Sequence, residues 1–485
     1  MNILLAAAEA APFAKVGGMA DVVGSLPKAL NRISLDARVI IPLYGSINQE
    51  KYNVRYMFSF PFTRRNGTAD VHVFTAEHND STFYFVKSWP FFGEENTVYS
   101  EWSWDMPRFI FFNQVALAVA WELKQRAGWF PDVFHANDWH TGLIPFLVDY
   151  SRQNPDWAQV ASIMTIHNMA YQGPYGGGWL WEAGVPGRHH PDLVYQDLTD
   201  NLLAIGIAYA DKISTVSPRH AIEIQHAYMA YGLEHLIRRR ADDLEGILNG
   251  LDMAEWNPAT DPRIFSNFAS DNFPEMRPPN KRNLQERLGL PVRDDVPLIG
   301  AVSRLVAQKG FDMATPALYT LLSDTEAQVV ILGTGEPAIE QQVQRLAQTF
   351  GRKARAILQY SATLAQQIYA ASDVFLMPSH YEPCGTSQMG AMRYGSLPLV
   401  RETGGLADTV ENYDGGDAER GTGFVFSWET PQAVLGTLRW AIETYHTKGA
   451  AWQRMQRRGM QVDFSWDKSA ERYADLYRRA LDKHR

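Results

Sequence analysis

Residues 3–22 read ILLAAAEAAPFAKVGGMADV, a short apolar run followed by a glycine-containing loop and the start of a second apolar segment. The run predicts a buried β-strand, and the segment after the glycines predicts a helix that begins beside them. Gly17 and Gly18 let backbone N–H groups approach an anion, the helix start adds the positive end of its dipole, and Lys15 adds a formal charge. The loop is therefore a candidate anion site, although these residues alone also fit a flexible strand-to-helix turn.

The same alternation of short β-rich runs and helical patterns continues along the chain. It is typical of parallel sheets with helices on both faces, in which ligands bind beyond the carboxyl ends of the strands. The runs of the first half lie at 3–5, 37–41, 83–86, 133–134, 162–166 and 212–216. Those of the second half lie at 298–302, 329–332, 356–358, 374–377 and 397–400. The sequence therefore predicts two doubly wound α/β sheets, with the chemically active side chains just after these runs.

Chain length and proline content suggest where the two sheets separate. The 485 residues exceed the roughly 250–300 at which a single core stops growing, so two domains with a cleft between them are expected. Seven prolines between residues 255 and 297 are typical of an inter-domain connection with little regular structure. We place the boundary near residue 255, which gives domains 1–254 and 255–465.

Charge and cysteine content exclude several classes of protein. The net charge of −9 argues against a nucleic-acid or anionic-membrane partner, which would need a basic face. Cys384 is the single cysteine, so an internal disulfide is excluded and a cytoplasmic, reducing compartment is expected. The first eight residues lack a basic region and run into Glu9, which favours a buried strand over a signal peptide. The longest apolar stretch, at 109–121, is too short to span a bilayer, so no membrane association is expected.

Two cations follow the first strand of the second half. Arg304 can bind a phosphate with two N–H groups, while Lys309 acts as a point charge. Taken alone, the two residues also fit a solvated surface pair. Their interpretation as a phosphate site depends on Lys15 of the other half facing them.

Glu382 is the candidate carboxylate of the second half. It follows the run 374–377 on a loop stiffened by Pro383, where a carboxylate can stabilise cationic character on a sugar carbon. A structural glutamate held in a salt bridge is the alternative. The adjacent Cys384 is favoured as a small buried side chain over a nucleophile, because no histidine is arranged as its base.

Histidines and amides also follow two strands of the first half, at 135–140 and 167–168. Such groups can hydrogen-bond sugar hydroxyls, and Trp139 can pack on a pyranose face. His135 and His140 fit buried core histidines equally well.

The pattern of metal-binding residues disfavours a metal site. The sequence has no His-Glu-x-x-His motif, no cysteine cluster and no two aspartates two residues apart. We therefore expect no metal and no cofactor, and a bound diphosphate would be neutralised by Lys15, Arg304, Lys309 and backbone dipoles.

One motif points to a different class of enzyme. Residues 333–338, Gly-Thr-Gly-Glu-Pro-Ala, follow a strand and fit the dinucleotide fingerprint of dehydrogenases. The acidic ribose partner expected about 20 residues further on is missing, since the next strand ends in Leu358-Gln359-Tyr360. The first sheet lacks the fingerprint, so an oxidoreductase is disfavoured.

Taken together, these motifs make the whole chain resemble bacterial and plant ADP-glucose-dependent glycogen and starch synthases. These are retaining glycosyltransferases of family 5 with two facing Rossmann-like domains, the GT-B fold. The order and spacing of seven short motifs carry the resemblance: Lys15-Val16-Gly17-Gly18, His135 to His140, His167-Asn168 with Tyr171-Gln172-Gly173, Asn249-Gly250-Leu251-Asp252, Ser303-Arg304-Leu305 with Gln308-Lys309-Gly310, Glu382-Pro383-Cys384-Gly385 and Thr403-Gly404-Gly405-Leu406.

The resemblance implies a role for each matched residue. Glu382 would lie beside the anomeric carbon, His167 would contact the transferred glucose, Asp138 would line the centre, and Arg304 and Lys309 would complete the catalytic set. Tyr360 would flank the adenine. The implied donor-binding residues are Lys15, Gly17, Gly18, Asp21, Asn249, Arg304, Lys309, Tyr360, Cys384, Gly385 and Thr386.

Two departures from the family pattern stand out. Val16 occupies a position where many relatives carry threonine, and this form resembles a plant and cyanobacterial branch. Thr386-Ser387 stand where Leu-Thr is expected, which affects the phosphate contact at Thr386. The resemblance also implies that a C-terminal helix, within residues 466–485, crosses back to pack on the first domain.

The resulting expectation is transfer of glucose from ADP-glucose to the non-reducing end of an α-1,4-glucan with retention of configuration, releasing ADP. A glucan-binding protein without activity and a pyridoxal-phosphate-dependent α-glucan phosphorylase are the alternatives. The preference for ADP over UDP comes from the resemblance alone. The residues leave open whether the product is glycogen or starch, the acceptor length and the oligomeric state.

Overall fold

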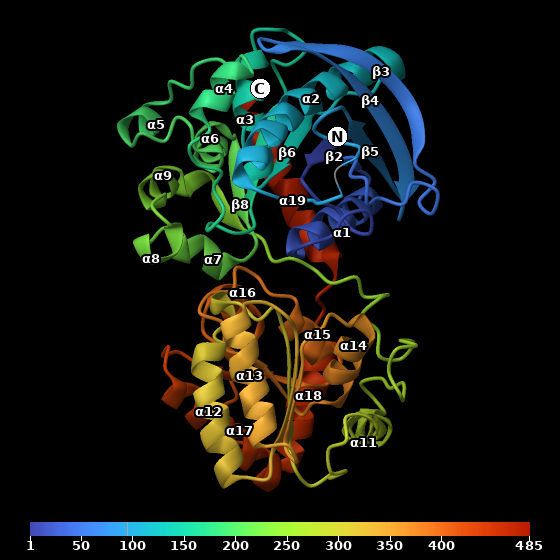
Figure 1. Ribbon diagram of the computed structural model, residues 1–485, viewed down its shortest axis with the longest axis vertical. Helices are drawn as coiled ribbons and strands as arrows, with labels where there is room; N and C mark the ends of the chain where they lie inside the picture. Colours follow the sequence, from blue (N-terminus) through green and yellow to red (C-terminus); the bar gives the residue numbers. More distant parts are fainter. Residues whose placement is uncertain (95) are drawn as a thin grey trace. The chain divides into compact units, whose positions relative to one another are not determined.

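The computed structural model describes residues 1–94 and 96–485 and contains two compact units, each with its own sheet and core (Figure 1). Unit 1 comprises Met1–Gly250 and Trp466–Arg485, and unit 2 comprises Leu251–Ser465. Both units are built on a largely parallel sheet with flanking helices. The predicted fold class of two Rossmann-like α/β domains is confirmed.

The sheet of unit 1 is doubly wound around β1. Its strands are β1 (Asn2–Ala6), β2 (Asp36–Pro42), β3 (Arg55–Arg64), β4 (Gly67–His78), β5 (Ser81–Lys87), β6 (Val133–Asn137), β7 (Ala161–Ile166), β8 (Lys212–Thr215) and β9 (Leu244–Gly246). They lie in the order β3-β4-β5-β2-β1-β6-β7-β8-β9, and all neighbours from β5 to β9 are parallel. The winding reverses direction between β1 and β6, and such a switch point is where ligands bind in this class of sheet.

An antiparallel hairpin extends this sheet beyond the predicted parallel strands. β3 and β4 pair with each other, and β4 pairs with β5, both antiparallel. Their residues alternate in burial because one face is solvated, in contrast to the buried parallel strands. The prediction of a wholly parallel sheet is therefore wrong at this edge.

The helices of unit 1 include the last helix of the chain. They are α1 (Gly18–Arg32), α2 (Trp102–Ala127), α3 (Ile144–Ser151), α4 (Gly177–Glu182), α5 (Pro191–Tyr195), α6 (Leu202–Tyr209), α7 (Pro218–Glu223), α8 (Ala227–Ala230), α9 (Glu234–Arg239) and α19 (Trp466–Leu481), with short 3₁₀ turns η1 (Trp139–Thr141), η2 (Ala241–Asp243) and η4 (Asp482–His484). The helix α19 contacts α1, β7 and β8, and Figure 1 shows it in red among the blue and green elements of this unit. Both ends of the chain thus belong to unit 1.

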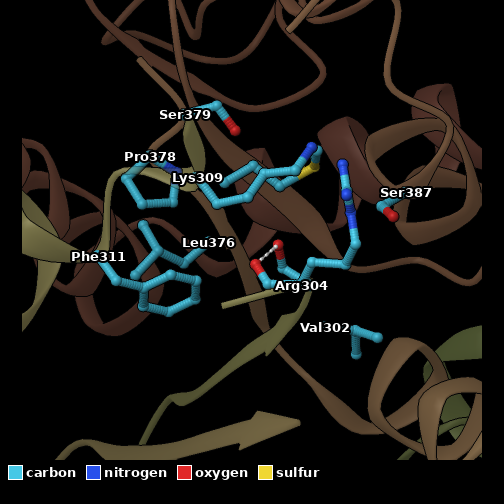
Figure 2. A pocket seen from close by; sticks show the side chains of 10 residues that line it. Val302, Arg304, Lys309, Phe311, Leu376, Pro378, Ser379 and Ser387 are labelled. Atoms are coloured by element: carbon cyan, nitrogen blue, oxygen red, sulfur yellow. Dashed lines mark hydrogen bonds between the residues drawn. The ribbon is translucent and has the colours of Figure 1, made fainter. Parts of the chain in front are cut away.

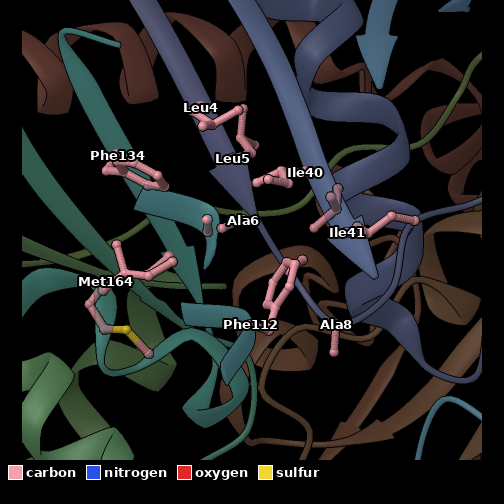
Figure 3. Packing of buried hydrophobic residues seen from close by; sticks show 14 of the residues in the cluster. Leu4, Leu5, Ala6, Ala8, Ile40, Ile41, Phe112, Phe134 and Met164 are labelled. Carbon is pink, nitrogen blue, oxygen red and sulfur yellow. The ribbon is translucent and has the colours of Figure 1, made fainter. Parts of the chain in front are cut away.

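The core of unit 1 explains why its central strands read as apolar runs. Figure 3 shows Leu4 and Leu5 of β1, Phe134 of β6, Met164 of β7 and Phe112 of α2 gathered in one cluster, and all five side chains are fully buried. Each such side chain contributes about 1.5–3 kcal/mol through removal of apolar surface from water. The buried core therefore fixes the strands from whose ends the site loops begin.

Unit 2 repeats the doubly wound plan. Its strands are β10 (Leu298–Val302), β11 (Gln328–Leu332), β12 (Ala354–Ile357), β13 (Val374–Met377), β14 (Leu397–Arg401) and β15 (Phe424–Phe426). They lie in the order β12-β11-β10-β13-β14-β15, all parallel. Here the switch point falls between β10 and β13.

The helices of unit 2 include two in the region predicted to be an irregular connection. They are α10 (Phe273–Met276), α11 (Pro278–Arg287), α12 (Phe311–Asp324), α13 (Pro337–Thr349), α14 (Ala362–Ala371), α15 (Ser387–Arg393), α16 (Gly404–Thr409), α17 (Pro431–Thr447) and α18 (Gly449–Gln461), with a 3₁₀ turn η3 (Ala307–Lys309). The helix α11 packs against α14, and Leu284 and Leu290 are buried in the core of unit 2. Residues 273–290 are therefore part of this domain, and the prediction of little regular structure is wrong for them.

Candidate functional site

A small pocket lies at the switch point of unit 2. Its volume is about 160 Å³, and it is lined by residues at the carboxyl ends of β10 and β13 and in the segments that follow them: Val302, Ser303, Arg304, Lys309, Phe311, Leu376, Met377, Pro378, Ser379 and Ser387. Figure 2 shows the Arg304 and Lys309 side chains extending to the same side of this pocket. The two cations singled out in the sequence are thus brought together at one strand-end pocket.

Lys309 and Glu382 form an ion pair beside this pocket. The Lys309 ammonium donates to Glu382 Oε2 at 2.5 Å, and the Ser379 hydroxyl donates to the same oxygen at 3.2 Å. Glu382 is 7% exposed, so the pair is largely shielded from water. The salt-bridged glutamate considered from the sequence is real, and its partner is the very lysine assigned to the phosphate.

Arg304 differs from Lys309 in having no partner of its own. Its side chain is exposed, and within residues 1–94 and 96–485 its guanidinium makes no hydrogen bond or ion pair. A guanidinium presents five N–H donors in a planar fork that matches a phosphate. Arg304 therefore has its full donor capacity available for an anion in the pocket.

Close backbone packing fixes the loop that carries Glu382. A Cβ on Gly404, which has a φ of +43°, would lie 2.0 Å from the Glu382 carbonyl oxygen, and one on Gly405 would lie 2.1 Å from that of Cys384. A Cβ on Gly310 would likewise lie 2.0 Å from the Pro378 carbonyl oxygen. Glycine at these positions lets the loops after β10, β13 and β14 pack against one another.

Two buried or half-buried cations support the same loop. Arg401 donates to the carbonyl oxygens of Ser379 and His380. The His380 ring lies between two carboxylates, with Nδ1 2.9 Å from Glu429 and Nε2 2.9 Å from Asp312. Partial burial lowers the pKa of His380, but the hydrogen bonds to these carboxylates outweigh it and raise the pKa above its usual value. Arg401, His380 and the two acids were not among the predicted site residues.

The glycines of the dinucleotide-like motif have a packing role. A Cβ on Gly333 would lie 1.8 Å from the Ser303 carbonyl oxygen, and one on Gly335 would lie 2.2 Å from that of Leu305. These glycines allow the loop after β11 to pair with the loop after β10 through Leu305 and Gly335. The structure therefore accounts for the motif without a dinucleotide.

The remaining predicted residues of unit 2 have different environments. Cys384 is 4% exposed, in agreement with a buried filler. Gly385 has a φ of +70°, and Thr386 precedes α15. Tyr360 follows β12 and is 87% exposed, so its ring is available for stacking.

In unit 1, the predicted anion loop is held by a carboxylate that the sequence analysis did not consider. Glu9 Oε2 accepts hydrogen bonds from the N–H groups of Val16 at 2.5 Å and Gly17 at 3.0 Å. Lys15 pairs with Asp21 at 2.6 Å, and both side chains are about half exposed. Gly18 begins α1, and a Cβ there would meet nothing within 4 Å. The loop thus has an occupied side facing Glu9 and an open side at Gly18.

Asp138 and His167 come together at the carboxyl ends of β6 and β7. Asp138 Oδ1 accepts from the backbone N–H of His167 at 2.7 Å, and its backbone has a φ of +56°. Burial raises the pKa of Asp138 to about 7, although the N–H groups of His167 and Asn168 favour its charged form. His167 Nε2 lies 2.9 Å from Asn137 Oδ1, and burial lowers the pKa of His167 to about 3, so the ring is neutral.

The other histidines and the tryptophan of this region are buried. His135 is a core histidine bound to Tyr477 and Thr165 at 2.8 and 2.6 Å. His140 is 6% exposed and packs on Tyr99. Trp139 is 8% exposed, and Gly173 covers its ring so closely that a Cβ added to this glycine would lie 2.3 Å from the indole. The prediction that Trp139 packs on a sugar is wrong, because its face is already occupied.

Asn249 follows β9 in a buried position. Its side-chain oxygen is buried without a hydrogen-bond partner among the described residues. Nothing in unit 1 therefore competes for this acceptor.

The described residues contain neither a metal-binding cluster nor a membrane-spanning helix. No group of three or more histidines, cysteines or acidic residues is placed to hold a metal ion in the part of the chain that the structure describes. Within the same residues, no helix has the length and apolar character needed to cross a membrane.

Comparisons with known proteins point to one family. Residues 2–239 match the family described as starch synthase catalytic domain, and residues 284–458 match that described as glycosyl transferases group 1. A glycogen synthase from Streptococcus sanguinis is 41% identical over 99% of this chain and 100% of its own length. One from Clostridium novyi is 41% identical over 100% of both chains. The solved catalytic domain of starch synthase IV from Arabidopsis thaliana, bound to ADP and acarbose, has a TM-score of 0.88 at 32% identity and covers 99% of each chain.

Proposed function

The chain belongs to the glycogen synthase family, and on that premise we propose that it transfers glucose from ADP-glucose to the 4-hydroxyl at the non-reducing end of an α-1,4-glucan. As a member of this family it is a glycosyltransferase. The ADP and the acarbose bound to the related starch synthase support the choice of donor and acceptor. Cytoplasmic action is part of the same proposal.

The observation that carries the proposal is the pairing of Lys309 with Glu382 beside the pocket of unit 2. A sugar-nucleotide reaction separates charge, since the sugar carbon becomes positive and the diphosphate leaves as an anion. A carboxylate and an ammonium 2.5 Å apart supply one group of each sign at one place. Fixed charges in a shielded site stabilise such a transition state strongly, because they need no reorganisation.

The proposed step breaks the bond between the anomeric carbon and the diphosphate oxygen and forms a bond to the acceptor 4-oxygen on the same face. The acceptor proton passes to the departing diphosphate, and ADP is released. Arg304 and Lys309 neutralise the diphosphate, and Glu382 stabilises the positive sugar without forming a covalent bond to it. Configuration is retained because both bonds lie on the same face.

Unit 1 is assigned the other contacts to the donor. Lys15 and Gly18 bind the diphosphate, and the exposed Lys15–Asp21 pair costs little to open because such pairs contribute about 0–1 kcal/mol. The neutral His167 hydrogen-bonds a hydroxyl of the transferred glucose, held by the contact of its backbone with Asp138. Asn249 offers an unpaired acceptor to the sugar.

Six further residues complete the proposed set of donor contacts. Tyr360 stacks on the adenine, for which its exposed ring is suited. Gly17, Asp21, Cys384, Gly385 and Thr386 shape the donor site through their loops.

The test supplies the purified chain with ADP-glucose or UDP-glucose and a maltooligosaccharide. Nucleotide release and chain length are measured together. The expected result is one released ADP for each glucose added, with a clear preference for ADP-glucose. Absence of elongation with either donor would overturn the proposal, and glucan binding without nucleotide release would favour a binding protein.

A phosphorylase is tested in the same preparation. Bound pyridoxal phosphate gives an absorbance band that an ADP-glucose-dependent enzyme lacks. Release of glucose 1-phosphate from glucan and inorganic phosphate would likewise contradict the proposed reaction.

A further inference from the structure

Glu9 contacts the backbone of the loop that is assigned to the donor diphosphate. It follows β1, is 2% exposed, and accepts from Val16 N at 2.5 Å and from Gly17 N at 3.0 and 3.2 Å. These two N–H groups belong to the glycine loop in which the sequence predicts backbone donors for an anion. A protein carboxylate therefore occupies donors that a phosphate would otherwise take.

Tyr99 influences the charge of Glu9, and the backbone next to Tyr99 is bound by α2. The Tyr99 side chain favours the charged form of Glu9 and lowers its pKa against the effect of burial, and its ring packs on His140 with centroids 4.9 Å apart. The fully buried Arg108 donates to the Val98 carbonyl at 2.8 Å, which anchors the backbone next to Tyr99. The position of the glycine loop is thus connected through side chains to a long helix of the core.

Charge and space distinguish the two sides of the loop. Burial raises the pKa of Glu9, while the hydrogen bonds from Val16 and Gly17 and the influence of the Tyr99 side chain favour its charged form. A Cβ on Gly17 would lie 3.2 Å from Glu9 Oε1, so this side is filled. A Cβ on Gly18 would meet nothing, and the N–H groups of the first helical turn have no partner within their own helix.

We propose that Glu9 is a positioning residue that fixes the Lys15-Val16-Gly17-Gly18 loop and remains bound to it when the donor binds. Glu9 does not contact the donor, whose diphosphate meets Gly18 N–H and Lys15 on the open side. The inference rests on the proposed function, because it assumes an ADP-containing donor. The competing role is that of an anion mimic, in which Glu9 leaves the loop and the diphosphate takes the N–H groups of Val16 and Gly17.

The experiment measures ADP binding to the full chain by titration calorimetry for wild type, Glu9→Gln, Glu9→Ala and Tyr99→Phe. A positioning role predicts roughly tenfold weaker ADP binding in Glu9→Ala, because the loop loses its buried acceptor. Glu9→Gln keeps one acceptor oxygen and Tyr99→Phe keeps the ring, so both are expected to lose less. The KM for ADP-glucose rises with the dissociation constant of ADP, while kcat changes less.

The matched control is Glu245→Ala, which removes another carboxylate of unit 1. Glu245 pairs with Arg472 and Arg479 and not with the loop, so this variant is expected to lower thermal stability without changing ADP affinity. Should Glu9→Ala fail to fold, Glu9→Gln and Tyr99→Phe carry the same test.

The outcomes separate the two proposals. Tighter ADP binding in Glu9→Gln or Glu9→Ala shows an anion mimic and overturns the positioning role, as does unchanged affinity. A wild-type chain that binds no ADP overturns the proposed function, and the inference with it.

Discussion

The Glu382 carboxylate depends on two donors, the Lys309 ammonium and the Ser379 hydroxyl. We expect Glu382→Gln to lower kcat by about a hundredfold or more, because it removes the fixed negative charge but keeps the size of the side chain. The measurement is the rate of ADP release at saturating ADP-glucose and maltooligosaccharide. ADP affinity should change little, since the diphosphate contacts are left in place.

The graded control for that variant is Ser379→Ala. It removes only the longer of the two hydrogen bonds to Glu382, at 3.2 Å, and leaves the ion pair with Lys309. A loss of less than tenfold in kcat is expected. Turnover of Glu382→Gln close to that of wild type would show that the carboxylate has no electrostatic role.

His380 makes the loop that carries Glu382 sensitive to pH. Its raised pKa means that the imidazolium form, bound to Asp312 and Glu429, stabilises the folded state. That contribution is complete below the unfolded value near 6.5 and is lost as the pH rises through the higher folded pKa. We expect the difference in melting temperature between wild type and His380→Gln to be largest near pH 6 and to shrink as the pH increases.

Salt provides a second readout of the same contact. Asp312 and Glu429 are about half exposed, so added salt should also reduce the difference by screening. A difference in melting temperature that is constant from pH 6 to pH 9 would contradict a charged His380.

At the scale of elements, the buried parallel strands were predictable and the half-solvated ones were not. β10 and β13 have the bounds expected from the sequence, because strands buried on both faces read as continuous apolar runs. β3 and β4 alternate between polar and apolar residues, and these two strands were not predicted from the sequence. The helix α11 begins with Pro278 and Pro279, which the sequence analysis treated as loop signals although proline also suits the first turn of a helix.

The candidate site shows the same division between local and long-range information. Arg304, Lys309 and Glu382 follow strands directly, so the doubly wound plan was sufficient to bring them near one switch point. Glu9 lies in a run of alanines, and a carboxylate next to an expected phosphate loop runs against simple charge matching. Contacts such as Asp312 with His380 join residues 68 positions apart, and no local pattern reveals them.

The glycine pair that begins α16, Gly404 and Gly405, tests how closely the loops must pack. Gly404→Ala would place a Cβ 2.0 Å from the Glu382 carbonyl oxygen at a residue whose φ is +43°. We expect a loss of about 2 kcal/mol or more in unfolding free energy and a lower kcat, because the Glu382 loop must shift. Denaturant unfolding and steady-state kinetics measure the two effects.

Gly436→Ala is the matched control for Gly404→Ala. Gly436 lies in α17, and a Cβ there would meet nothing within 4 Å. Alanine is favoured over glycine inside a helix by about 0.5–1 kcal/mol, so this variant should be slightly more stable with unchanged kcat. Equal behaviour of the two variants would mean that the close approach to Glu382 is unimportant.

On the scale of the whole molecule, unit 1 is completed only by the last 20 residues of the chain, Trp466–Arg485. The chain leaves this unit after Gly250, forms unit 2 and returns as α19. Glu245 of β9 pairs with Arg472 and Arg479, and Ser469 donates to the Leu248 carbonyl at 2.5 Å. The sheet that positions Glu9, Asp138 and His167 therefore depends on a helix more than 200 residues away in sequence.

Tyr477 provides the most buried polar link between α19 and that sheet. Its hydroxyl lies 2.8 Å from His135 Nδ1, while His135 Nε2 is bound to Thr165 of β7. Burial lowers the pKa of His135 to about 3, so the ring is neutral and each of its nitrogens needs a hydrogen-bond partner.

Tyr477→Phe leaves Nδ1 without one and should cost about 1–3 kcal/mol in the unfolding free energy of unit 1. Denaturant unfolding, followed by a probe in each unit, should show the unfolding transition of unit 1 shifted and that of unit 2 unchanged. The control is Tyr150→Phe, at a 52% exposed position, which should shift neither transition. Because the hydrogen bond stabilises the sheet without contacting substrate, kcat below the unfolding transition should stay at the wild-type value. An unshifted unit 1 transition would show that this hydrogen bond does not contribute to holding α19.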